Sequence, residues 1–157
     1  MATATIPEGN TKVVRLISLV SIIAGVVLIV AGIGTWTLVR SDLIKEHITV
    51  SADAQAFGGN EVSGPFEAFY QADAIAGHVL KSTGGKTYAQ LAQDDPLRAT
   101  AMNGSFLRTS LFTSVIAFGV AAFAMGVGLL FLLMGWALRR LVRTEVVVTE
   151  PKVVPAE

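Results

Sequence analysis

Two histidines and a few scattered carboxylates are the residues with the most potential for chemistry in this chain. His47 and His78 are 31 positions apart, and each stands alone in its stretch of sequence. The carboxylates that could join them in a metal site are Asp53, Glu61, Asp94 and Asp95. Metal sites made from histidine and carboxylate use recognisable spacings that bring the donors together. None of these spacings occurs here, so the sequence favours solvated polar side chains and predicts no metal site.

A glycine-containing turn resembles the end of a phosphate-binding loop. Gly85-Lys86-Thr87 supplies the last glycine, the lysine and the hydroxyl of that motif. The motif also requires a glycine five positions before Gly85, where this chain has Leu80. We therefore expect a plain turn at this position and no nucleotide site.

Two adjacent aspartates offer a possible pair for general acid and base catalysis. Asp95 is followed by Pro96, and this order is typical of a helix start, with the carboxylate as cap and proline at the first helical position. Capping explains Asp94 and Asp95 more simply than catalysis. The sequence therefore predicts no enzyme, no catalytic residue, no cofactor and no small-molecule substrate.

The composition indicates a membrane protein. Of the 157 residues, 52% are hydrophobic and 15% are charged, whereas soluble proteins average about 25% charged residues. No charged residue occurs in 16–39 or in 109–138. Each run exceeds the roughly 20 apolar residues that cross a bilayer. The sequence predicts an all-α membrane protein, in which two transmembrane helices form an antiparallel hairpin and the loop between them is mostly helical.

The charges beside the two apolar runs predict the topology. Lys12 and Arg15 precede the first run, and three arginines follow the second: Arg139, Arg140 and Arg143. Short, positively charged tails stay in the cytoplasm, so we expect a multi-pass plasma-membrane protein with both termini cytoplasmic. The expected parts are cytoplasmic tails at 1–15 and 139–157, transmembrane helices at 16–39 and 109–138, and an extracytoplasmic loop domain at 40–108. A cleaved signal peptide is the rival interpretation of the first run, which is too long for a signal core.

Each predicted span carries a stripe of small residues. The stripes are Ser18, Ser21, Gly25 and Gly32 in the first span, and Ala117, Ala121, Ala124, Gly128 and Gly135 in the second. Steps of three, four and seven keep a stripe on one helical face, and small residues let helices approach closely in lipid. We expect these faces to pack the two helices together or against helices of another protein. The alternative is that small residues are simply common in membrane helices.

The remaining features of the spans suit a passive membrane role. Trp36 and Trp136 fall near the ends of the predicted spans. We expect them to lie at opposite membrane surfaces and, with Arg139, Arg140 and Arg143, to anchor the helices there. Neither span contains an acidic, basic or histidine residue, although ion and proton pathways need such groups at depth. The net charge is zero, so nucleic acid is not an expected partner. Without cysteine the chain has no disulfide.

The predicted loop domain alternates between ordered segments and breaks. A short strand is expected at 47–51, and a helix is expected to start at Gly64-Pro65 and to end at Gly84-Gly85. Its apolar stripe is Ala68, Phe69, Ala72, Ile75, Ala76, Val79 and Leu80, and its polar side is Glu67, Gln71, His78 and Lys81. A second short helix is expected from Pro96, followed by a turn or kink at Asn103-Gly104 and a cap at Ser105 for the second span.

Two further segments allow two interpretations each. The aromatic residues of the loop are Phe66, Phe69, Tyr70 and Tyr88. We expect them to fill the core of the loop domain, and the alternative is an aromatic patch for a partner. The proline-containing segment 145–157 is expected to be an unstructured tail, or to add a strand to the sheet of a partner.

Three stretches carry a resemblance to a known family. They are Tyr70-Gln71-Ala72-Asp73-Ala74-Ile75-Ala76-Gly77-His78, Gly84-Gly85-Lys86-Thr87-Tyr88-Ala89-Gln90-Leu91, and Asp94-Asp95-Pro96 with Asn103-Gly104-Ser105-Phe106-Leu107-Arg108. Over roughly 12–140 the chain resembles a family of small two-span membrane proteins of actinobacteria. Members have been labelled ring-opening dioxygenases, a reaction that needs a set of metal ligands this sequence lacks. Similar proteins also occur as accessory subunits of the respiratory supercomplex that joins a cytochrome bc complex to a cytochrome oxidase.

These observations lead to one expected function and one alternative. The resemblance implies a non-catalytic accessory subunit of a plasma-membrane complex, with the actinobacterial respiratory supercomplex as the favoured assembly. Its expected partners are the lipid bilayer and other membrane subunits. The alternative is a free-standing envelope protein, a regulator or transport accessory that forms homo-oligomers.

Overall fold

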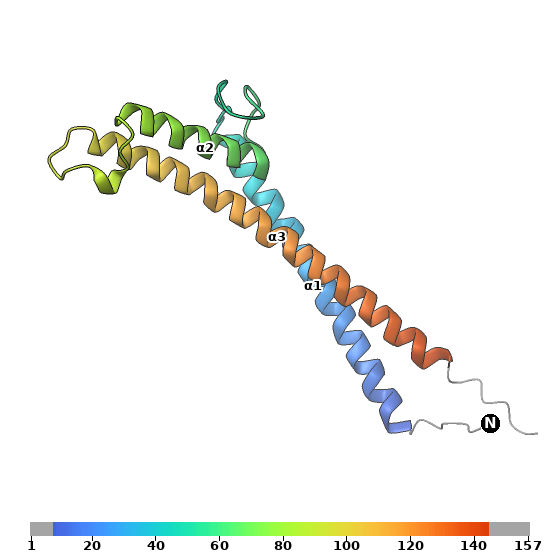
Figure 1. The fold of residues 1–157 in the computed structure, drawn as a ribbon. Coiled ribbons are helices and arrows are strands. Elements are labelled where there is room, and N and C mark those ends of the chain that lie inside the picture. The colour runs from blue at the N-terminus through green and yellow to red at the C-terminus, as the bar shows by residue number, and fades with distance from the viewer. Residues whose placement is uncertain (1–7, 145–157) are drawn as a thin grey trace, which may run out of the picture. The chain divides into compact units, whose positions relative to one another are not determined.

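The computed structural model describes residues 8–144, which form an all-α fold (Figure 1). The helices of this part of the chain are α1 (Glu8–Lys45), α2 (Pro65–Ser82), the 3-10 helix η1 (Tyr88–Gln90) and α3 (Arg98–Thr144). Helices α1 and α3 are long and apolar enough to cross a membrane, which confirms the all-α class with two candidate spans. The predicted tail 145–157 lies outside the described residues.

The chain divides into two compact units. The first unit contains the described residues of Met1–Val30 and Met125–Glu157, and the second unit is Ala31–Ala124. Helices α1 and α3 contribute to both units. At about 1.5 Å per residue, the 38 residues of α1 measure about 57 Å and the 47 residues of α3 about 70 Å. Because their bounds are Glu8–Lys45 and Arg98–Thr144, both helices extend beyond the charge-free runs 16–39 and 109–138.

Helix α2 begins and ends where the sequence predicts. Gly64 is the N-cap, Pro65 occupies the first turn and Glu67 adds an acidic side chain there. After Ser82 the chain reverses through Gly84 and Gly85, which both have positive φ. Glycine adopts this left-handed backbone without the steric penalty that a Cβ would bring, so these two residues can end the helix.

The predicted short helix after Pro96 is wrong, because that segment is the beginning of α3. The Asp95 carboxylate accepts a hydrogen bond from the backbone N–H of Leu97, at 2.9 Å, just before α3 begins. A turn or a kink was expected at Asn103-Gly104, and the turn is absent, since α3 runs through both residues. A Cβ on Gly104 would collide with the Val79 side chain. The glycine therefore serves close packing with α2, which offsets its cost of roughly 1 kcal/mol in a helix.

Ser105 is likewise not a cap. It lies inside α3, where its hydroxyl donates to the carbonyl of Ala101 at 2.8 Å. Serine and threonine make this bond four residues back within helices, so a serine alone does not mark a helix start.

The segment between α1 and α2 folds back on itself without forming a regular strand. Thr49 and Glu61 form the single antiparallel bridge of this segment. The strand predicted at 47–51 is therefore wrong, apart from this one bridge. The Val50 N–H donates to the Asn60 carbonyl at 2.9 Å, and the Val62 N–H donates to the Ile48 carbonyl at 2.8 Å. The side chains of Val50 and Val62 are turned into the core of the second unit.

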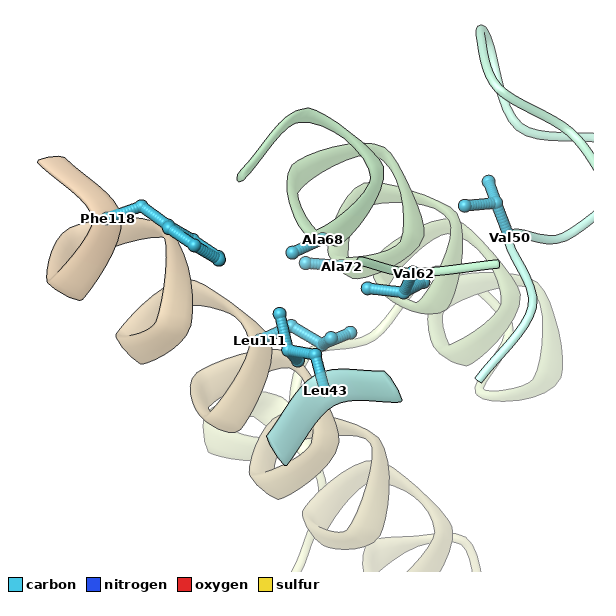
Figure 2. Close-up of a cluster of buried hydrophobic side chains, with 7 residues drawn as sticks. All are labelled: Leu43, Val50, Val62, Ala68, Ala72, Leu111 and Phe118. Carbon is cyan, nitrogen blue, oxygen red and sulfur yellow. The ribbon is translucent and has the colours of Figure 1, made fainter. Parts of the chain in front are cut away.

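That core gathers residues from four segments of the second unit. Figure 2 shows the side chains of α1, of the segment between α1 and α2, of α2 and of α3 around one apolar centre: Leu43, Val50, Val62, Ala68, Ala72, Leu111 and Phe118. The two alanines of α2 are fully buried, and Phe69 and Phe112 meet edge to face at 5.8 Å. Helix α2 thus packs its small residues against α3.

The polar side predicted for α2 is wrong at one position. Gln71 is buried, with only 9% of its surface exposed. Its amide oxygen accepts hydrogen bonds from Ser51, at 2.7 Å from the backbone nitrogen and 3.2 Å from the hydroxyl. A buried polar side chain is tolerated when such bonds replace those with water, and these two bonds hold the preceding segment against α2.

The aromatic residues of the loop are not all core residues. Tyr70 is partly buried and its ring lies 5.5 Å from the rings of both Phe57 and Phe69. Phe66 is two-thirds exposed, and Tyr88 lies beneath the Arg98 guanidinium at 4.2 Å. Phe69 is also exposed, by 44%. The expectation that these aromatic residues fill the core of the loop domain therefore fails for Phe66, Phe69 and Tyr88.

Candidate functional site

The first unit is organised around a close approach of two glycines. A Cβ on Gly25 would lie 2.6 Å from the Gly128 carbonyl oxygen, and a Cβ on Gly128 would lie 2.7 Å from the Gly25 carbonyl oxygen. Real Cβ atoms do not approach so closely, so only glycine fits on either helix. Such backbone proximity is the geometry by which helices associate in lipid.

The contact between the helices continues at Gly135. A Cβ there would lie 2.8 Å from the Ser18 carbonyl oxygen and 2.6 Å from Ile22. Ser18 is fully buried and donates its hydroxyl to the Arg15 carbonyl at 3.2 Å. Small residues of α1 therefore contact small residues of α3 at two places in the first unit. We call this contact the glycine seam, and it consists of Gly25, Gly128 and Gly135 with Ser18.

The other small residues of the two predicted stripes also lie on covered faces. Ser21, Gly32 and Ala121 are buried, and Ala117 and Ala124 are half-buried. Residues elsewhere on the same helices are exposed, including Val27, Val120 and Leu130. Burial is therefore concentrated on the face that carries the small residues.

The expected interface anchors occupy different surroundings. The Trp36 ring packs edge to face on Phe118, with centroids 4.7 Å apart. Trp136 is exposed, and the Arg140 guanidinium lies 5.0 Å from its ring centroid. Arg139 is exposed, whereas the side chain of Arg143 lies outside the described residues. Sequence spacing did not indicate that Trp36 would pack against α3.

The two histidines pair with separate carboxylates. The Nε2 atom of His78, on α2, lies 2.8 and 3.0 Å from the two carboxylate oxygens of Asp53, and the Lys81 amine is 3.8 Å from the same carboxylate. His47 lies 3.8 Å from Glu61. Among residues 8–144, no group of three or more metal-ligating side chains comes together.

The hydrogen bond from His78 lowers the pKa of Asp53 below its ordinary value of 3.8. The charge of Lys81 acts in the same direction to a lesser extent. The histidine and the carboxylate belong to α2 and to the segment before it, so their hydrogen bond fastens these elements together at an exposed edge. Its contribution to stability is limited by solvent screening.

Asp53→Asn is expected to loosen the segment 48–62 in a pH-dependent manner. A carboxyl whose pKa is lowered by folding stabilises the fold above its ordinary value, and this contribution disappears as the pH falls through the lowered pKa. Amide hydrogen exchange in 48–62 should therefore be faster in the variant than in the wild type near neutral pH. Below the lowered pKa the two proteins should exchange alike, whereas an acid-insensitive difference would contradict the assignment.

A cavity of about 620 Å³ lies in the second unit between the end of α1, helix α2 and the first half of α3. Its apolar wall includes Val39, Leu43 and Leu111, and its polar wall includes Asp42, Glu46 and Gln71. This volume is within the roughly 300–1,000 Å³ common for ligand sites. No sequence pattern indicated the cavity, because its lining comes from three helices and from Glu46 and Ile48 in the segment between α1 and α2.

The remaining polar motifs of the sequence lie in a cap, in turns or at exposed positions. Thr87 and Gln90 form a capping box around η1, with the Thr87 N–H donating to the Gln90 side chain at 2.9 Å. Lys86 follows the two positive-φ glycines and lies in a turn. Asp94 is exposed. The Asp95 carboxylate accepts a hydrogen bond from the Leu97 N–H in the turn before α3. The turn at 85–87 therefore follows a helix, whereas a phosphate-binding loop follows a strand.

Comparisons of the chain with protein-family models, with curated proteins and with solved structures give no match.

Proposed function

We propose that this chain is a non-catalytic, two-span accessory subunit of a larger plasma-membrane complex. One observation carries the proposal: the most apolar windows of α1 and α3 are only 22% and 17% buried. A core helix of a soluble protein would bury most of such a window. The exposed apolar side chains need lipid or the helices of another membrane protein around them.

The two spans are proposed to form an antiparallel hairpin closed by the glycine seam. The pairing of Gly25 with Gly128, and of Ser18 with Gly135, supports this arrangement, because residue numbers rise along α1 as they fall along α3. The opposite faces remain free for a partner or for lipid: Val20, Val27, Ile116, Val120, Phe123 and Leu130. The seam thus holds the subunit together and leaves its aliphatic surface available for assembly.

The favoured assembly is the actinobacterial respiratory supercomplex of cytochrome bc complex and cytochrome oxidase. The sequence resemblance supports this choice, and the absence of ionisable residues from 16–39 and 109–138 suits a subunit that supplies surface and no electron or proton path. Purification of the tagged chain in mild detergent tests the assignment. Comigration with haem absorbance on native gels is expected, and a chain that migrates only with copies of itself would instead be a free-standing envelope protein.

Deletion of the chain is expected to leave the absorption spectra of the redox centres unchanged. The yield or detergent stability of the assembled complex should fall, because lost helix contacts shift the association equilibrium. Spectra and native-gel yields of the deletion strain and its complemented strain measure both effects. Unchanged yield, stability and activity after deletion would contradict the assignment.

The proposed topology has both termini in the cytoplasm and 40–108 outside. The chain contains no cysteine, so a single introduced thiol reports one position. Ser82→Cys should react with a membrane-impermeant thiol reagent on intact cells, and Thr149→Cys should react only after lysis. The reverse pattern would overturn the positive-flank interpretation.

A further inference from the structure

We propose that the cavity between α1, α2 and α3 binds a membrane phospholipid whose headgroup ends in an ammonium group. The inference rests on the proposed insertion of α1 and α3 in a membrane. It follows from the position of the cavity, from the charges on its wall and from the amide of Gln71, a buried residue that lines it.

The cavity straddles the predicted outer limit of the bilayer. Val39 and Ala117 line one part of it and belong to the charge-free runs, whereas Asp42 and Glu46 line it beyond those runs. The apolar part therefore lies at the depth of acyl chains and the acidic part at the depth of headgroups. A lipid can enter such a cavity from the surrounding bilayer, with its acyl chain in the apolar part and its headgroup in the acidic part.

The charges on the cavity wall favour a cationic headgroup. Asp42 and Glu46 are its charged residues, and no lysine, arginine or histidine is among the residues that line it. Lys45 lies 3.0 Å from Asp42, but both side chains are about 70% exposed and this ion pair is weak. The Glu46 carboxylate makes no hydrogen bond or ion pair within residues 8–144. An ammonium group can donate three hydrogen bonds to such acceptors.

The Gln71 amide supplies the donor that a lipid phosphate or ester oxygen requires. Its oxygen is occupied by Ser51, and its nitrogen has no hydrogen-bond partner among the described residues. No unpartnered side-chain nitrogen or oxygen in that part of the chain is fully buried. Gln71 is nine-tenths buried and lines the cavity, and its amide nitrogen is the donor that we assign to this wall.

The neighbouring hydroxyls add acceptors. Thr113 donates its hydroxyl proton to the Thr109 carbonyl at 2.8 Å, and Ser114 donates to the Ser110 carbonyl at 3.3 Å. Their oxygens can therefore only accept from a ligand. A wall with many acceptors and one donor matches phosphatidylethanolamine better than phosphatidylglycerol, which lacks a cation, or phosphatidylcholine, whose ammonium has no N–H to donate.

The test offers the purified full chain equal amounts of phosphatidylethanolamine, phosphatidylcholine and phosphatidylglycerol with identical acyl chains. Retained lipids are counted by native mass spectrometry. The wild type is expected to retain phosphatidylethanolamine about threefold over each of the others, the size of effect that exposed ion pairs provide. Equal retention of the three lipids would overturn the inference.

Two variants and a control locate the site. Glu46→Gln should bring the ratio of phosphatidylethanolamine to phosphatidylglycerol close to one, whereas Asp73→Asn, the same change at an exposed position of α2, should leave it as in the wild type. Ser114→Leu should reduce the number of lipids retained by filling the cavity. An unchanged ratio in Glu46→Gln, with native helix content, would also overturn the inference.

Carbonate extraction separates this inference from its premise. A chain that stays in alkali-washed membranes but shows no preference among the lipids overturns the lipid site alone. A chain that alkaline carbonate releases overturns the proposed membrane insertion, and the lipid site with it.

Discussion

Gly128→Leu is expected to break the glycine seam and to cost about 3 kcal/mol or more in helix association. Overpacking a tight contact costs about 1–3 kcal/mol when side chains can adjust. Here the first atom in the way is the Gly25 carbonyl oxygen, 2.7 Å from the position of the new Cβ. Backbone atoms cannot rotate aside, so the helices must separate. Thermal unfolding in detergent and the yield of copurifying partner measure the loss.

The matched control lies two residues away on the same helix. A Cβ on Gly126 meets nothing within 4 Å, and leucine is the better helix former by roughly 0.5–1 kcal/mol. Gly126→Leu should therefore leave the unfolding temperature unchanged or raise it slightly. Equal damage from both variants would mean that the small residues of α3 reflect composition and not packing.

Phe118→Ala is expected to destabilise the second unit by about 3 kcal/mol. Phe118 is the largest fully buried side chain of the described residues, with 1% of its surface exposed, and its ring meets Trp36 edge to face at 4.7 Å. Removing the ring leaves a cavity and removes this aromatic contact. Denaturant unfolding measures the stability, and Trp36 emission in a Trp136→Phe background reports the local change.

Phe123→Ala is the control for that variant. Its side chain is 72% exposed, so truncation removes few protein contacts and should change stability by about 0.5 kcal/mol or less. The Trp36 emission should also stay as in the parent. A comparable loss in Phe123→Ala would show that the aromatic content of α3, and not the buried ring, determines stability.

Features that depend on local chemistry could be predicted from the order of the residues alone. The absence of charge from 16–39 and 109–138 is enough to predict two long apolar helices, because only a helix satisfies the backbone of such a segment in lipid. The boundaries of α2 could also be predicted from the sequence. Proline is favoured at the first helical position, and two glycines with positive φ end the helix.

Features that depend on neighbours distant in the chain became apparent in the folded protein. The pair Asn103-Gly104 by itself favours a turn, yet α3 continues through it. Because Gly104 has no side chain, it leaves room for Val79 of α2. Gln71 reads as a surface residue, yet Ser51 supplies the bonds that allow its burial. The pairings of His78 with Asp53 and of Trp36 with Phe118 join residues 25 and 82 positions apart. Local propensity contributes about 1 kcal/mol or less per residue, and packing and buried hydrogen bonds outweigh it at these positions.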